Sequence, residues 1–361
     1  MPAEPERILL IRPSALGDVC RTVPVLVSLR ARFPGARIDW LVRDAYAPAV
    51  AAHPDITGVV SFPRAALTGW WKGGAPTRHL LAFLHALREP RYDMVIDCQG
   101  LFRSGVFAAA TGSRRRLGWA GAPEAAPLFY TRDHRVRAPR GVHTVEHMLA
   151  LAAAAGAAPI RDLRLYPSAH DRAALDPRLR DARFALLAPT SRWPGKRWPA
   201  ERFAVLANRL LSEGAVAAVA VVGGPGEREQ CGPLTALADR DPRVIDLIGR
   251  TSVGGLLAAV ERSALVVAND SAALHMAVGL ARPLVALFGP TRVDLVGPYG
   301  READVIQHAG PADPLDHKHE AAGRALMERI SVDEVFAAAL QRLRRPAPRS
   351  AERAPAAVSA T

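Results

Sequence analysis

The feature that most constrains the fold is an alternation of short apolar runs with longer helical patterns, which occurs twice along the chain. This alternation is typical of parallel α/β units. The strands predicted in the first half are RILLIR (7–12), RIDWLV (37–42), GVVSF (58–62) and YDMVIDC (92–98). Those predicted in the second half are FALLAP (184–189), AVAAVAVVG (215–223), RVIDLI (243–248), ALVVAN (264–269) and PLVALFG (283–289). The pattern predicts two Rossmann-like, doubly wound α/β domains that face each other across a cleft.

Chain length and local composition place the domain limits. A chain of 361 residues is too long for one comfortable core. The predicted helices lie at 18–32, 145–156, 199–213, 227–239, 252–261 and 271–280. A segment rich in Pro, Asp and Arg separates the two halves, so we expect domains at 1–160 and 161–344. Residues 345–361 combine proline, alanine and charge without periodicity and predict a disordered tail.

The net charge restricts the partners that the chain can bind, and the cysteines indicate its redox compartment. The formal net charge of +12 indicates nucleic acid, anionic lipid or phosphorylated ligands, or simply a solvated basic surface. Only the charge supports a basic nucleic-acid-binding protein, because no recognition helix, zinc knuckle or RNP-type strand is recognisable. Cys20, Cys98 and Cys231 are far apart and odd in number, which predicts neither disulfides nor a metal cluster and fits a reducing cytoplasm. No signal peptide or membrane-spanning stretch is recognisable.

Polar residues fall directly after four predicted strands, at the edge where doubly wound sheets bind ligands. In TSRWPGKRWP, Lys196 follows a turn beside the hydroxyls of Thr190 and Ser191, which suits a diphosphate or an ordinary surface turn. In GGPGERE, Glu227 opens a helix, where it either favours the helix dipole or accepts hydrogen bonds from a ribose. In NDSAALH, Asp270 or Ser271 caps a helix whose free N–H groups form an anion site.

Three further features leave alternatives open. His275 lies one turn into that helix, either facing the same ligand or buried as a satisfied core residue. The opening loop PSALGDV lacks the G-x-G-x-x-G of a dinucleotide site. Beside Ser14, its Asp18 is either a helix-start residue or a carboxylate that takes a proton from an attacking hydroxyl.

Two predicted loops each allow two interpretations. The predicted loop from Arg64 to His79, which includes Trp71 and Lys72, suits an anionic, carbohydrate-bearing or membrane-surface partner, or is a packed loop with solvated charges. The spacing of His317 and His319 hints at a metal, but no second ligand pair lies nearby, so we expect no metal site.

With these residues in place, the chain resembles the heptosyltransferase family of bacterial glycosyltransferases, which build the inner core of lipopolysaccharide. The resemblance runs from about Ile8 to Arg344. It rests on ILLIRPSALGDVCRTVPVLVSLRARFPGARIDWLV, YDMVIDCQGLFRSG, KRWPAERFAVLANRL, VVGGPGERE and VVANDSAALHMAVGLARPLVALFGPT, in this order. It implies a GT-B arrangement, an inverting transfer without metal or other cofactor, an acceptor in the first domain and a sugar nucleotide in the second.

The resemblance also implies roles for individual residues. Asp18 matches the aspartate of the family's S-x-x-G-D motif, the expected general base. Lys196 and Asp270 match residues that contact the donor, with Lys196 contributing to catalysis as well. The other matches to the donor pocket are Thr190, Ser191, Glu227, Thr251, Ser271, Ala272 and His275. Ser14, Arg64, Trp71 and Lys72 are expected to bind the acceptor.

The expected reaction moves heptose from ADP-heptose to a Kdo or heptose unit of an anionic lipopolysaccharide precursor. The enzyme is then cytoplasmic, with transient contact to the inner face of the cytoplasmic membrane. NDSAALH resembles the second-heptose enzymes, whereas LVGPYG (295–300) resembles the first-heptose enzymes. The alternatives are a transferase or epimerase for another nucleotide sugar.

Overall fold

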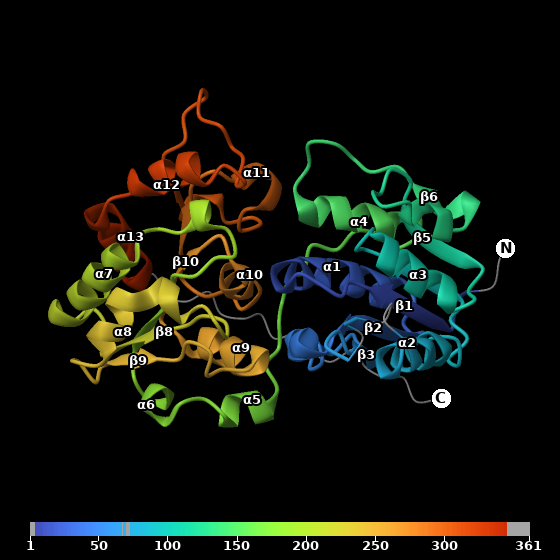
Figure 1. Cartoon of the computed structure of the whole chain (residues 1–361), viewed down its shortest axis with the longest axis horizontal. Helices are drawn as coiled ribbons and strands as arrows, with labels where there is room; N and C mark the ends of the chain where they lie inside the picture. The colour runs from blue at the N-terminus through green and yellow to red at the C-terminus, as the bar shows by residue number, and fades with distance from the viewer. Residues whose placement is uncertain (1–3, 67, 70–72, 345–361) are drawn as a thin grey trace.

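The fold consists of two parallel six-stranded sheets, each flanked by helices, in a computed structural model that describes residues 4–66, 68–69 and 73–344. Figure 1 shows the two sheets in separate lobes, with the first half of the chain in one and the second half in the other. The strand orders are β3-β2-β1-β4-β5-β6 and β12-β11-β10-β7-β8-β9. The predicted class of two doubly wound α/β domains is confirmed.

The first sheet contains β1 (Arg7–Ile11), β2 (Arg37–Arg43), β3 (Gly58–Phe62), β4 (Met94–Asp97), β5 (Arg115–Trp119) and β6 (Arg135–Val136). Its helices are α1 (Leu16–Arg32), α2 (Ala75–Ala86), α3 (Phe102–Ala110) and α4 (Thr144–Ala154). The four strands predicted here are confirmed, whereas β5 and β6 were not predicted. The predicted loop from Arg64 to His79 is wrong at its end, because Pro76 allows α2 to begin at Ala75.

The second sheet contains β7 (Phe184–Ala188), β8 (Ala218–Val221), β9 (Val244–Asp246), β10 (Leu265–Asn269), β11 (Leu284–Phe288) and β12 (Val305–Gln307). Its helices are α5 (Ala169–Ala173), α6 (Pro177–Arg180), α7 (Ala200–Ser212), α8 (Gly232–Ala238), α9 (Val253–Arg262), α10 (Ala272–Gly279), α11 (Val293–Val296), α12 (Glu320–Glu328) and α13 (Val332–Arg344). All five predicted strands are confirmed. The helix predicted at 227–239 is a 3₁₀ turn followed by the shorter α8.

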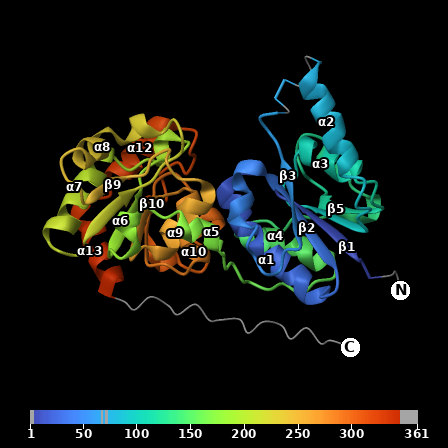
Figure 2. The same cartoon turned by 90° about the horizontal axis from the view of Figure 1, so that it is seen from below.

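The lobes meet through α1 and α10, which pack against each other between the two sheets (Figure 1). Both lobes contribute to one apolar cluster, which includes Leu26 of α1 and Met276 of α10. From another side, Figure 2 shows α2 on the outer part of the first lobe, away from this interface. Among the described residues, no helix combines the length and the apolar character that a membrane crossing requires.

Candidate active site between the two sheets

Asp18 lies in the first turn of α1, just after the carboxyl end of β1. One carboxylate oxygen pairs with Arg12 Nη2 at 2.7 Å, and the other pairs with Arg21. Burial alone would raise the pKa of Asp18, but the charges of Arg12 and Arg21 outweigh it and lower the pKa to about 2. Asp18 is therefore fully ionised at neutral pH.

The two arginines tie Asp18 to distant parts of the chain. Arg12 is buried and also donates to the carbonyl of Cys98, which follows β4. Arg21 Nη1 donates to the carbonyl of Val296 in the second lobe at 3.2 Å. The position of Asp18 thus depends on how the two lobes sit against each other.

Lys196 and Asp270 form an ion pair at the carboxyl edge of the second sheet, where the neighbouring strands β7 and β10 end. Lys196 closes the 3₁₀ turn η5 (Pro194–Lys196), and Asp270 follows β10 directly. Their side chains are 14% and 11% exposed, and Lys196 Nζ lies 2.6 Å from Asp270 Oδ2. The backbone of η5 is held tightly, because a Cβ on Gly323 of α12 would lie 2.6 Å from the carbonyl oxygen of Gly195. A partly buried cation is therefore fixed beside the start of α10.

The start of α10 has free hydrogen-bonding groups. Ser271 occupies the N-cap position, but its side chain caps nothing, and its buried Oγ has no partner in the described structure. Ser271 is thus the N-cap residue, one of the two predicted, but it makes no capping hydrogen bond through its side chain, and Asp270 pairs with Lys196 instead. Unsatisfied N–H groups at a helix start attract anions.

His275 of α10 is buried against the first lobe. A Cβ built on Gly17 would lie 2.8 Å from His275 Cδ2 and 3.7 Å from the Cα of Ala272. Burial, reinforced by the charge of Arg21, lowers the pKa of His275 well below its usual range, so the ring is neutral. This contact brings the loop of Asp18 against the first turn of α10.

The remaining residues predicted for the donor pocket lie at the same edge of the second sheet. Thr190 and Ser191 follow β7, and both are buried. Glu227 follows β8, where its Oε2 accepts from the N–H of Gly224 at 2.6 Å. Thr251 follows β9 and directly precedes Ser252, the N-cap of α9. All four residues therefore follow strands at the carboxyl edge of the second sheet, as the sequence predicts. One carboxylate oxygen of Glu227 is already engaged in a hydrogen bond within its own loop.

The residues predicted to bind the acceptor are not all brought together. Ser14 lies in the turn of Asp18, and its N–H donates to Gln99 Oε1 at 3.2 Å. Arg64 is exposed after β3, which β2 separates from β1. Trp71 and Lys72 lie outside the described residues.

Sequence reasoning missed Arg12 and Arg21 at this site and considered His317 only as a metal ligand. Arg12 ends the first apolar run, and Arg21 lies three positions after Asp18, a spacing that places both on one helix face. Burial lowers the pKa of His317, with the charge of Lys196 adding to the shift and that of Asp270 opposing it. Its ring packs edge-on against Trp193, with centroids 4.8 Å apart.

Within the described ranges, no group of three or more His, Cys, Asp or Glu side chains is arranged to hold a metal ion. The cations at the site are instead guanidinium and ammonium groups.

Two Rossmann-like sheets with polar groups of both at their shared interface match the GT-B fold of solved heptosyltransferase structures. The chain belongs to glycosyltransferase family 9 (heptosyltransferase), whose family model matches residues 80–325. It is accordingly a glycosyltransferase. The confirmed family is the one that the sequence motifs resemble.

Individual relatives cover most of the chain. Lipopolysaccharide heptosyltransferase 1 of Pseudomonas aeruginosa is 30% identical over 301 residues, covering 82% of each chain. Lipopolysaccharide heptosyltransferase 2 of Escherichia coli K12 is 27% identical and covers 83% of this chain and 88% of its own. The solved structure of E. coli ADP-heptose LPS heptosyltransferase II has a TM-score of 0.75 at 24% identity, covering 93% of this chain and 98% of that one. The last likeness establishes the fold.

Proposed function

We propose that this enzyme transfers a heptose from ADP-heptose to the inner core of a lipopolysaccharide precursor. Two findings support this: membership of the heptosyltransferase family, and relatives named lipopolysaccharide heptosyltransferases that align over most of the chain. The observation that carries the mechanism is the contact of Gly17 with His275 and Ala272, because it sets Asp18 beside the helix start expected to hold the diphosphate.

In the proposed reaction, Asp18 accepts the proton of the acceptor hydroxyl. The hydroxyl oxygen forms a bond to the anomeric carbon as the bond from that carbon to the diphosphate oxygen breaks. ADP leaves from the opposite face, so the configuration at the anomeric carbon is inverted. Lys196 and the N–H groups at Ser271 and Ala272 stabilise the negative charge that develops on ADP. These groups supply positive charge without a metal ion.

The paired state of Asp18 bears on this role. A carboxylate with a pKa of about 2 is a weak base. Arg21 also donates a hydrogen bond to the carbonyl of Val296 in the second lobe. A movement between the lobes would therefore change the ion pair of Arg21 with Asp18. We propose that acceptor binding loosens the Arg21 contact, which raises the basicity of Asp18 where the proton is transferred.

The remaining parts of the proposal concern the surroundings. We propose that the first lobe, to about residue 160, binds the acceptor and that the second, to residue 344, binds the donor. Ser14 and Arg64 are the described candidates for acceptor contacts. Because the acceptor is lipid-linked, we also propose that the enzyme works at the inner face of the cytoplasmic membrane through transient contact.

A transfer assay tests the proposal. The purified enzyme is offered ADP-heptose, UDP-sugars and other ADP-sugars, with truncated lipopolysaccharide acceptors that end in Kdo or in heptose. We expect an acceptor of higher mass by one heptose with ADP-heptose alone, and the acceptor used identifies the step. Exclusive use of a UDP-sugar, or an epimerised free sugar formed without acceptor, would refute the proposal.

A further inference from the structure

A second pocket lies at the edge of the first sheet opposite to Asp18. It has a volume of about 500 Å³ and lies where β4 and β5 begin and α3 ends. It is lined by Glu4, Arg88, Arg91, Tyr92, Asp93, Thr111, Gly112, Ser113, Arg114 and Arg115. The length of β1, five residues, separates this edge from the edge of Asp18, about 13 Å at the usual rise per residue. The pocket is therefore distinct from the candidate active site.

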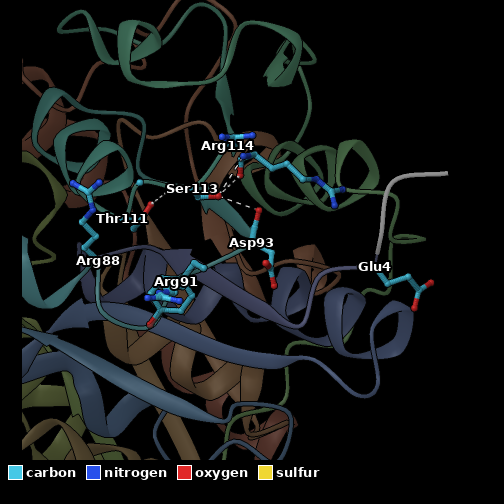
Figure 3. A pocket seen from close by; sticks show the side chains of 10 residues that line it. Glu4, Arg88, Arg91, Asp93, Thr111, Ser113 and Arg114 are labelled. Atoms are coloured by element: carbon cyan, nitrogen blue, oxygen red, sulfur yellow. Dashed lines mark hydrogen bonds between the residues drawn. The ribbon is translucent and has the colours of Figure 1, made fainter.

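The charges around this pocket are unbalanced. Four of its ten lining residues are arginines, and none of the four makes an ion pair with any described residue. Figure 3 shows Arg88 and Arg91 on one side of Ser113 and Arg114 on the other. Some surface arginines of this chain, such as Arg178 and Arg243, pair with a neighbouring aspartate, which none of these four does.

The two acids of the pocket are engaged elsewhere. Glu4 pairs with Arg32 of α1 at 2.7 Å. Asp93 Oδ2 accepts from the backbone N–H groups of Glu6 and Arg7, each at 2.9 Å. Glu4 is therefore offset by Arg32, and Asp93 alone counts against the charge of the four guanidinium groups.

The helix ends at this edge offset only part of the charge. Both α2 and α3 end beside the pocket, and each helix C-terminus carries about half a negative charge. Asp93 adds one more negative charge. Four guanidinium groups thus retain an excess of about two positive charges when both helix ends are counted.

We propose that this pocket is a second anion site, which binds a phosphate-bearing ligand. Guanidinium groups match the geometry of phosphate oxygens and bind them through paired hydrogen bonds. The volume lies within the range of small-molecule sites, about 300–1,000 Å³, and leaves room for the group to which the phosphate is attached. Both a soluble phosphate ester and a lipid headgroup present this chemistry.

The test has one arm for each source and uses the full chain saturated with ADP, so that the proposed donor site is filled. The first arm titrates inorganic pyrophosphate by calorimetry. The second measures co-sedimentation with phosphatidylcholine vesicles, with and without phosphatidylglycerol. Binding of pyrophosphate identifies a soluble ligand, whereas binding only to the anionic vesicles identifies a headgroup, and either result supports the site.

A pair of double variants decides whether the binding is local. Arg88→Gln with Arg114→Gln should weaken it about tenfold or more, since the variant loses charge-assisted hydrogen bonds to the phosphate. Arg132→Gln with Arg240→Gln removes the same charge from exposed positions outside the pocket and should leave binding nearly unchanged. Equal weakening in both double variants overturns the proposal. So does the absence of binding to both millimolar pyrophosphate and the anionic vesicles.

The result is separable from the proposed heptose transfer. Arg88 and Arg114 are exposed and lie outside the candidate active site, so their replacement should leave heptose transfer to a soluble acceptor unchanged. If that double variant unfolds, Arg91→Gln with Arg115→Gln serves as the second test of the same pocket.

Discussion

Gly17 of α1 and His275 of α10 touch across the interface of the two lobes, at a point where no side chain fits on Gly17. A Cβ there would lie 2.8 Å from His275 Cδ2, closer than real Cβ contacts. Packing against the second lobe therefore requires a glycine beside Asp18. The backbone conformation does not require one, since the φ of Gly17 lies outside the left-handed region.

Replacement of Gly17 by alanine should therefore push the lobes apart at the active site. Overpacking costs about 1–3 kcal/mol, and we expect a matching fall in the free energy of unfolding together with a loss of turnover. Denaturant unfolding and transfer kinetics measure the two effects. Gly35→Ala is the matched control, because nothing lies within 4 Å of a Cβ at that position. If Gly17→Ala behaved like this control, the contact would have no importance for activity.

Asp18→Asn should abolish most turnover but also leave two arginines without their anion. We expect turnover to fall by about 10²–10⁴, the usual contribution of a general base, while ADP binding is kept. The substitution also lowers stability, because it leaves the buried Arg12 and its neighbour Arg21 without their anion. The double variant Asp18→Asn with Arg21→Gln removes one unpaired charge and should recover stability without recovering turnover. Recovered turnover would show that Asp18 is not the base.

The ion pairs of Asp18 should make stability depend on pH in the acid range. Folding lowers the pKa of this carboxyl from 3.8 to about 2, so the pairs stabilise the folded state above about pH 4 and lose this contribution towards pH 2. The full contribution is about 2 kcal/mol. Denaturant unfolding of the wild type and Arg21→Gln should therefore differ at pH 6, with a smaller difference near pH 2.5. Arg240→Gln, at an exposed position, should show no such trend; a constant difference for Arg21→Gln would contradict the assignment.

Lys196→Ala should weaken binding of ADP, because it removes the cation beside the start of α10. The loss of a hydrogen bond to a charged group predicts an increase in Kd of about tenfold or more. Calorimetry with ADP measures this directly. Lys318→Ala removes an exposed lysine and should change the affinity far less. Unaltered affinity in Lys196→Ala would exclude a diphosphate contact.

Removal of metal ions should leave heptose transfer unchanged. The proposed charge stabilisation comes from Lys196 and the start of α10, which do not respond to a chelator. Turnover with and without EDTA, measured with protein that has been dialysed against the chelator, checks this. A loss that Mg²⁺ or Mn²⁺ restores would require a metal in the mechanism.

The strands that sequence analysis found are those whose apolar runs are continuous. RILLI and LVALF are buried along almost their whole length, which gives an unmistakable pattern. The strand RRLGW (115–119) starts with two arginines and contains a glycine, so its own residues do not favour a strand; pairing with β4 provides the stabilisation. Local pattern cannot show this, because the partner lies more than 15 residues away along the chain.

The candidate site was predictable at the ends of strands but not in its pairings. The positions of Asp18, Lys196 and Asp270 follow from the rule that ligands bind at the carboxyl edge. Pairing of Asp18 with Arg12 and Arg21 depends on how the chain turns after β1, and burial of His275 depends on the other lobe. Such long-range packing leaves no mark in a local motif.

The apolar cluster that runs through α1 and α10 makes the two lobes poor candidates for separate expression. A fragment ending after α4 would expose the face of α1 that now packs on α10. Exposed apolar patches of this kind promote self-association. The halves of this enzyme should therefore fold and remain dispersed only when both are present, which co-expression of the two fragments would reveal as a recovered heterodimer.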